Sequence, residues 1–209
     1  MAGTGERCVV PVSDLELEGW FVPAATGGAG AVVAPPHPLY GGLLTNPVVT
    51  AAAGGFAELD VATLAFNYRG TGASQGRAND DAGTAVQDYT GALDALAGRV
   101  PGPYLAAGYS FGSRAALSVA ATDHRVRGAV LIAPPVDMVG PDDFGAFSGP
   151  LLVIVGDRDA YAPLERLTAA LAARPDARLE VVDGADHFFS ATGTSAITAH
   201  VAAHVSGWL

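Results

Sequence analysis

The pentapeptide Gly108-Tyr109-Ser110-Phe111-Gly112 stands between a short apolar run and an alanine-rich segment. The run at 104–107 predicts a buried strand, and residues 113–121 predict a helix, so the chain must turn sharply at Ser110. Glycine has no Cβ, and glycines on both sides of the serine let the strand and the helix approach closely. The pattern GxSxG therefore predicts that the Ser110 hydroxyl lies at the carboxyl edge of a sheet. The N–H of Phe111 and the positive end of the helix would point at the space above it.

The size and composition of the chain predict one folded domain over residues 1–209. Half of the residues are hydrophobic (50%) and 15% are charged, which excludes a disordered chain. The longest apolar runs are too short to cross a bilayer, and residues 1–10 lack the features of a secretory signal, so we expect a soluble, cytoplasmic protein. The single cysteine, Cys8, agrees with a reducing compartment and is expected to be a buried apolar residue.

The charge balance limits the possible partners. The sequence has 11 Lys and Arg against 21 Asp and Glu, which gives a formal net charge of −10 at pH 7. Such a negative field repels nucleic acid and anionic membranes. We therefore expect no nucleic-acid or membrane partner. We also expect a small-molecule substrate and a monomer or homodimer, although the charge itself gives no information about the substrate.

Strands and helices are expected to alternate along the chain. Strands are predicted at 7–12 and 15–22, which form an antiparallel hairpin, and at 30–34, 60–68, 104–107, 126–133, 150–155 and 178–182. Helices are predicted at 48–59, 80–98, 113–121, 163–173 and 195–208. Between Pro134 and Pro150 there is room only for a loop or one helical turn, so no lid domain is expected. The alternation predicts an α/β fold whose mainly parallel, twisted sheet has helices on both faces.

A serine hydroxyl is a weak nucleophile until a base accepts its proton and a third group orients that base. His187 lies in a loop after the last predicted strand, which places it at the same sheet edge as Ser110. Asp159 follows another strand and completes the chain order Ser, Asp, His that is typical of this kind of turn. Its neighbour Asp157 is expected to cap the turn through its own backbone. The predicted catalytic residues are therefore Ser110, Asp159 and His187.

The remaining histidines have different surroundings. His37 lies in a proline-rich loop that either shapes the site or forms a rigid surface turn. His200 and His204 are four residues apart on a helix; without the glutamate of an HExxH motif between them, they predict a solvated helix face and no metal site. His124 is expected at the surface. The glycine-rich segment 69–76 lacks the spacing of a phosphate loop, so we expect a tight loop near the site that binds no nucleotide.

Three motifs resemble those of the α/β-hydrolase superfamily. They are Gly108-x-Ser110-x-Gly112, Gly156-Asp-Arg-Asp159 and Gly184-Ala-Asp-His187, in this order and each after a predicted strand. The segments Pro36-His37-Pro38-Leu39-Tyr40-Gly41-Gly42 and 66–74 are similar to those of small, lidless hydrolases related to the dienelactone hydrolase branch. The resemblance covers nearly the whole chain, although dienelactone hydrolase has a cysteine nucleophile in place of Ser110.

The resemblance implies a serine hydrolase that cleaves a small ester or thioester through an acyl-enzyme, with no cofactor and no metal. The N–H groups of Phe111 and Leu39 would form the oxyanion hole, and Tyr40 is the alternative to Leu39 because Pro38 has no N–H. A shallow pocket for compact acyl groups would be formed by the candidate substrate-binding residues Tyr40, His37, Tyr109, Tyr161 and Phe188. The same fold also hosts ligand receptors and lyases or cyclases that use the histidine for proton transfer, and these stay open as alternatives.

Overall fold

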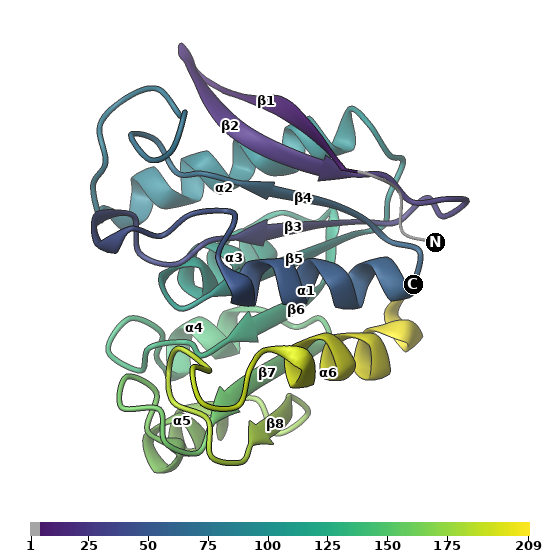
Figure 1. The fold of residues 1–209 in the computed structure, drawn as a ribbon. Coiled ribbons are helices and arrows are strands. Elements are labelled where there is room, and N and C mark those ends of the chain that lie inside the picture. Colours follow the sequence, from purple (N-terminus) through teal and green to yellow (C-terminus); the bar gives the residue numbers. More distant parts are fainter. Residues whose placement is uncertain (1–4) are drawn as a thin grey trace.

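The computed structural model describes residues 5–209, which contain one eight-stranded, mostly parallel sheet (Figure 1). Its strands are β1 (Glu6–Val12), β2 (Leu15–Val22), β3 (Gly30–Ala34), β4 (Ala62–Phe66), β5 (Tyr104–Tyr109), β6 (Val126–Ile132), β7 (Leu151–Gly156) and β8 (Arg178–Val182). Their spatial order is β1-β2-β4-β3-β5-β6-β7-β8, and β2 pairs antiparallel with both β1 and β4. Residues 1–4, which belong to the expected domain and to the segment searched for a secretory signal, lie outside the described part of the chain.

Helices cover both faces of this sheet (Figure 1). On one face α1 (Pro47–Glu58) packs against α6 (Ser195–Val205). On the other face lie α2 (Ala82–Ala97), α3 (Phe111–Thr122), α4 (Pro141–Ala146) and α5 (Leu164–Leu171). Successive strand residues point to opposite faces, so Val32 and Val33 of β3 belong to two different apolar clusters, one beneath each helix layer.

The predicted fold class is confirmed, including the N-terminal antiparallel hairpin. The predicted bounds of the strands at 15–22, 30–34 and 178–182 agree with the structure. The strand predicted at 60–68 is shorter, because Asp60 has a φ of 56° and belongs to the turn that ends α1. The last helix ends at Val205 and is followed by the 3-10 turn η2 (Ser206–Trp208). Within residues 5–209, none of the helices has the length and apolar character needed to span a membrane.

The topology brings two loops together at the carboxyl edge of the sheet. β3 and β5 are parallel neighbours, and Ala34 at the end of β3 pairs with Gly108 near the end of β5. The chain leaves β3 towards α1 on one face and leaves β5 towards α3 on the other. A crevice at such a switch point is the usual position of a ligand site in a parallel sheet. The segment after β3 therefore lies beside the turn that carries Ser110.

Candidate active site

Ser110 lies at the turn between β5 and α3 with a φ of 53° and a ψ of −119°. A positive φ is unfavourable for a residue with a Cβ and is found most often where function requires it. The two flanking glycines are needed for this geometry. A Cβ on Gly108 would lie 2.2 Å from the Gly112 carbonyl oxygen, and one on Gly112 would lie 2.6 Å from that of Pro35. The Ser110 N–H donates to the carbonyl of Ile132 at 2.8 Å, which anchors the turn to β6.

Ser110, His187 and Asp159 form a continuous chain of hydrogen bonds. Ser110 Oγ lies 2.9 Å from His187 Nε2, and His187 Nδ1 lies 2.8 Å from Asp159 Oδ2. All three residues are buried. The structure therefore brings together the three side chains that were predicted from separate loops. With Asp159 ionised and accepting from Nδ1–H, Nε2 is the nitrogen that can accept the serine proton.

Asp159 is held by the turn that follows β7. The N–H groups of Tyr161 and Ala162 both donate to Asp159 Oδ1 at 2.8 Å. Asp159 therefore caps this turn, and the expectation that Asp157 would do so is wrong. A capping carboxylate accepts hydrogen bonds from N–H groups two or three residues further along the chain. Two residues after Asp157 is Asp159, and its N–H donates to the Gly156 carbonyl instead.

Tyr109 supports the loop that carries His187. Its hydroxyl donates to the backbone carbonyl of His187 at 3.0 Å, and its ring lies 5.7 Å from the imidazole. Burial, with contributions from Asp159 and Asp186, raises the pKa of Tyr109, so the hydroxyl keeps its proton and stays a donor. Tyr109 is thus a buried wall of the site, while its hydroxyl fixes the position of the His187 backbone.

A cleft of about 380 Å³ opens above Ser110. Its lining includes all five predicted substrate-binding residues, which are His37, Tyr40, Tyr109, Tyr161 and Phe188. Tyr40, Tyr161 and Phe188 are exposed at the rim by 86%, 57% and 61%. None of the lining residues is Asp, Glu, Lys or Arg, so the only ionisable side chains in the lining are imidazoles and phenols.

The segment after β3 forms a short 3-10 helix, η1 (Pro38–Tyr40), that the sequence did not predict. The Leu39 N–H donates to His37 Nδ1 at 3.3 Å, and the Tyr40 N–H donates to the His37 carbonyl at 3.1 Å. Burial lowers the pKa of His37, so its ring is neutral and Nδ1 can accept. The His37 ring lies 4.8 Å from that of Phe111, which begins α3 and has no acceptor for its N–H within the helix. Leu39 and Tyr40, the two predicted sources of a second oxyanion donor, therefore lie beside the turn at Ser110, and their N–H groups are bonded to His37.

Asn67, which was not predicted as a functional residue, connects the segment after η1 to the N-terminal hairpin. It is buried directly after β4, where its Oδ1 accepts the N–H of Leu44 at 2.7 Å and its Nδ2 donates to Glu18 Oε2 at 2.7 Å. These bonds tie the segment that follows η1 to the N-terminal hairpin. The available signal was an amide at the end of an apolar strand, because a buried amide requires partners for both of its ends.

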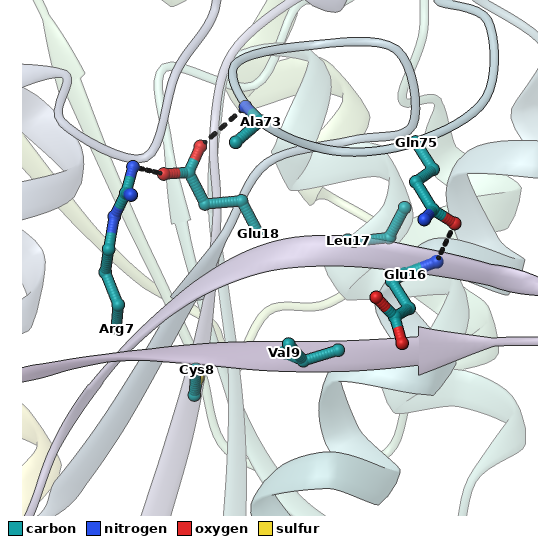
Figure 2. Close-up of a pocket in the computed structure, with 8 residues that line it drawn as sticks. All are labelled: Arg7, Cys8, Val9, Glu16, Leu17, Glu18, Ala73 and Gln75. Carbon is teal, nitrogen blue, oxygen red and sulfur yellow. Dashed lines mark hydrogen bonds and ion pairs between the residues drawn. The ribbon is translucent and has the colours of Figure 1, made fainter.

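The glycine-rich segment 69–76 packs against the N-terminal hairpin (Figure 2). Gln75 Oε1 accepts the N–H of Glu16, and the Ala73 N–H donates to Glu18, which also pairs with Arg7. None of these segment residues lines the cleft above Ser110. We expected this segment to form a loop near the site. Instead, hydrogen bonds to β2 hold it on the hairpin, outside the lining of the cleft.

Other expectations also change with the structure. Cys8 is half-buried rather than buried, because β1 is an edge strand of the sheet. His200 and His204 are half-buried and both contact Glu180 of β8, so the helix face that was expected to be solvated is only partly so. His124 is exposed, as predicted.

Comparison with known proteins agrees with this architecture. The sequence model of a family described as an alpha/beta hydrolase domain matches residues 41–206. An alpha-beta serine hydrolase homologue from Coxiella burnetii is 27% identical, with a TM-score of 0.84 over 95% of this chain and 96% of that chain. A serine hydrolase without a lid from Xanthomonas campestris is 26% identical, with a TM-score of 0.84 over 98% of this chain and 95% of that chain.

A more distant structure has the same fold. Dienelactone hydrolase from Anabaena variabilis, 21% identical, shares the fold with a TM-score of 0.81 over 99% of this chain and 98% of that chain. The family match spans the turn at Ser110, the loops that carry Asp159 and His187, and most of the sheet. On this evidence the chain belongs to the alpha/beta hydrolase domain family, with serine hydrolases, one of them without a lid, among its structural neighbours.

Proposed function

We propose that the protein is a serine hydrolase that cleaves a small ester or thioester through an acyl-enzyme intermediate. The observation that carries this proposal is the hydrogen-bonded chain from Ser110 through His187 to Asp159, with the serine at a strained turn. In the proposed reaction, Ser110 Oγ attacks the carbonyl carbon while His187 Nε2 accepts the hydroxyl proton. Asp159 keeps the imidazole in the required tautomer and stabilises the imidazolium that forms.

The negative charge that develops on the carbonyl oxygen must be stabilised by hydrogen-bond donors close to Ser110. We assign this role to the N–H groups of Phe111 and Leu39. A preorganised donor contributes about 3 to 4 kcal/mol in the transition state, and Leu39 contributes less than this because its N–H must first leave His37. Leu39 is preferred over Tyr40 because its present hydrogen bond to His37 is longer, 3.3 Å against 3.1 Å, and is given up more easily. His187 then donates its proton to the leaving group, and water hydrolyses the acyl-enzyme by the same route.

The lining of the cleft favours an uncharged substrate. A substrate carboxylate would lose its water without meeting Lys or Arg, since the cleft has none. The aromatic rim of Tyr40, Tyr161 and Phe188 suits a compact acyl or alkoxy group, and a long acyl chain would leave apolar surface in water. A cytoplasmic location, the lack of nucleic-acid and membrane partners, and a monomer or homodimer remain predictions from the sequence.

Turnover of p-nitrophenyl acetate and p-nitrophenyl butyrate by the purified protein tests the proposal. Ser110→Ala should lose at least about 10³-fold of kcat, because the acyl-enzyme can no longer form. Ser118→Ala, also on α3 but outside the lining of the cleft, should keep the wild-type rate and serves as the matched control. Turnover that survives in a folded Ser110→Ala protein would overturn the acyl-enzyme and favour proton-transfer chemistry by His187.

A further inference from the structure

Glu180, His200 and His204 form a compact cluster away from the cleft. His204 Nε2 lies 2.9 Å from Glu180 Oε1, and His200 Nδ1 lies 3.4 Å from Glu180 Oε2. The two imidazoles are nearly parallel, with an angle of 12° between their planes and 6.2 Å between their centroids. One nitrogen or oxygen atom from each of the three side chains lies within 4.8 Å of the other two. Two imidazoles and a carboxylate therefore converge on one small volume.

The secondary structure explains this convergence. His200 and His204 are one turn apart on α6 and share one face of that helix. Glu180 is two residues from Val182 on β8, and alternation along a strand puts both on the same face of the sheet. Val182 belongs to the apolar cluster beneath α1 and α6, so Glu180 points to the face that α6 covers. The sequence alone showed no third group near the two histidines, because Glu180 comes from a different element.

We propose that Glu180, His200 and His204 bind a divalent transition-metal ion, of which zinc fits this set of ligands best. Two histidines and a glutamate are a common zinc ligand set, with water in the remaining position. Zinc holds such atoms at about 2.0 to 2.2 Å, which corresponds to about 3.4 Å between ligand atoms in a tetrahedron. The three ligand atoms lie within 4.8 Å of one another, so they would have to approach one another by up to about 1.4 Å to bind the ion. Calcium and magnesium prefer oxygen ligands and fit less well.

The side chains are accessible enough for an ion to enter and for water to complete its coordination. The side chains of His200, His204 and Glu180 are 28%, 27% and 14% exposed.

Within residues 5–209, Arg178 is the one Lys or Arg that forms an ion pair with the Glu180 carboxylate. Its Nε donates to Glu180 Oε1, the oxygen that also faces His204. The Arg178 side chain is 62% exposed, so it can turn into solvent when an ion replaces it. Without a metal, the same residues would form only a cluster of hydrogen bonds and ion pairs. The effect of Arg178 therefore separates the two interpretations.

A metal at this position would join the two ends of the loop that carries His187. Glu180 lies on β8 before the loop, His200 and His204 lie on α6 after it, and residues 183–194 run between the two elements. Because the ion would bind the folded protein and not the unfolded chain, it would stabilise the fold and restrain this loop. The proposed role is structural, and it does not depend on the proposed hydrolase reaction.

Calorimetric titration of the EDTA-treated full chain with zinc chloride, together with thermal unfolding, tests the proposal. The wild type should bind one zinc ion and unfold at a higher temperature with zinc than without it. His204→Ala and Glu180→Gln should each bind zinc at least about tenfold more weakly. Loss of a group that only hydrogen-bonds to a metal ligand already lowers metal affinity by about tenfold or more, and loss of the ligand itself should lower it at least as much. Arg178→Gln should bind as tightly as the wild type or more tightly.

Controls separate this site from the other histidines. His124→Ala changes an exposed histidine outside the cluster and should leave the zinc affinity unchanged. The absence of zinc binding in the wild type would overturn the proposal and leave an ordinary ion-pair cluster. Unchanged affinity in the double variant His200→Ala/His204→Ala would also overturn it and would place the ion elsewhere, for example on His37 or His187.

Discussion

Two imidazole–carboxylate pairs in this protein have nearly the same nitrogen–oxygen distance in very different surroundings. His187 Nδ1 lies 2.8 Å from Asp159 in the cleft, and His204 Nε2 lies 2.9 Å from Glu180 between α6 and β8. The side chains of the first pair are 8% and 0% exposed, and those of the second are 27% and 14% exposed. The two pairs also differ in their third partner, which is the Ser110 hydroxyl in the cleft and the His200 imidazole on α6. The pair alone therefore does not determine the chemistry, because burial and the third group decide it.

Removing the imidazole of the buried pair should have the largest effect. In His187→Ala no base accepts the Ser110 proton, so kcat for p-nitrophenyl acetate should fall by about 10⁵ to 10⁶. His124→Ala, which removes an exposed imidazole, should leave kcat within about twofold of the wild type. A folded His187→Ala protein that retains a tenth of the activity would contradict the role of His187 as the base.

Neutralising the carboxylate of the buried pair should cost less. Asp159→Asn keeps an oxygen for the N–H groups of Tyr161 and Ala162 but no longer stabilises the imidazolium, so kcat should fall by about 10⁴. Asp157→Asn, an exposed change two residues away, is the matched control and should keep kcat unchanged. Equal losses in the two variants would show that Asp159 does not orient His187.

The hydroxyl of Tyr109 should have a smaller effect through the position of His187. Tyr109→Phe removes the donor to the His187 carbonyl, and we expect the free energy of unfolding to fall by about 1 kcal/mol and kcat to fall by less than about tenfold. Tyr104→Phe removes a similar bond, to the Val100 carbonyl at 2.7 Å, far from the cleft. It should lose similar stability with no change in kcat. Equal kcat values for the two variants would exclude a positioning role for Tyr109.

Asp60, a carboxylate without an imidazole partner, should give the smallest effect when it is substituted, an effect on stability that disappears at low pH. Hydrogen bonds from the Thr26 hydroxyl and from the N–H groups of Ala25 and Thr26 lower the pKa of Asp60 from 3.8 to about 2. Because the folded-state pKa is lowered, the ionised group stabilises the protein above pH 3.8, and this contribution is lost as the pH falls towards about 2. The difference in Tm between the wild type and Asp60→Asn should shrink over that range. A constant difference would contradict the assignment.

Local patterns were enough to predict much of the fold and the buried pair. The strand at 30–34 is an unbroken apolar run between glycine and proline, so its bounds follow directly from the sequence. The turn at Ser110 follows from its two glycines, because only residues without a Cβ fit there. His187 and Asp159 follow from their positions after strands, since the carboxyl ends of parallel strands share one edge.

Features that depend on contacts between distant elements could not be predicted in this way. Alternation gives the face on which Glu180 lies, but the helix that covers this face depends on the path of the whole chain. The segment 69–76 is held on the hairpin by partners in β2, which its own composition does not reveal. The turn η1 requires the Leu39 N–H to find His37 Nδ1, and this depends on the rotamer of one side chain.

The most direct test of the account is to map the residue that reacts with a fluorophosphonate probe by mass spectrometry of the labelled protein. We expect one adduct per chain, on Ser110, because among the serines of residues 5–209 its hydroxyl alone is bonded to an oriented imidazole. The adduct should be absent in Ser110→Ala and present in Ser118→Ala. No adduct on the wild type, or an adduct on another residue, would contradict the assignment of Ser110 as an activated nucleophile.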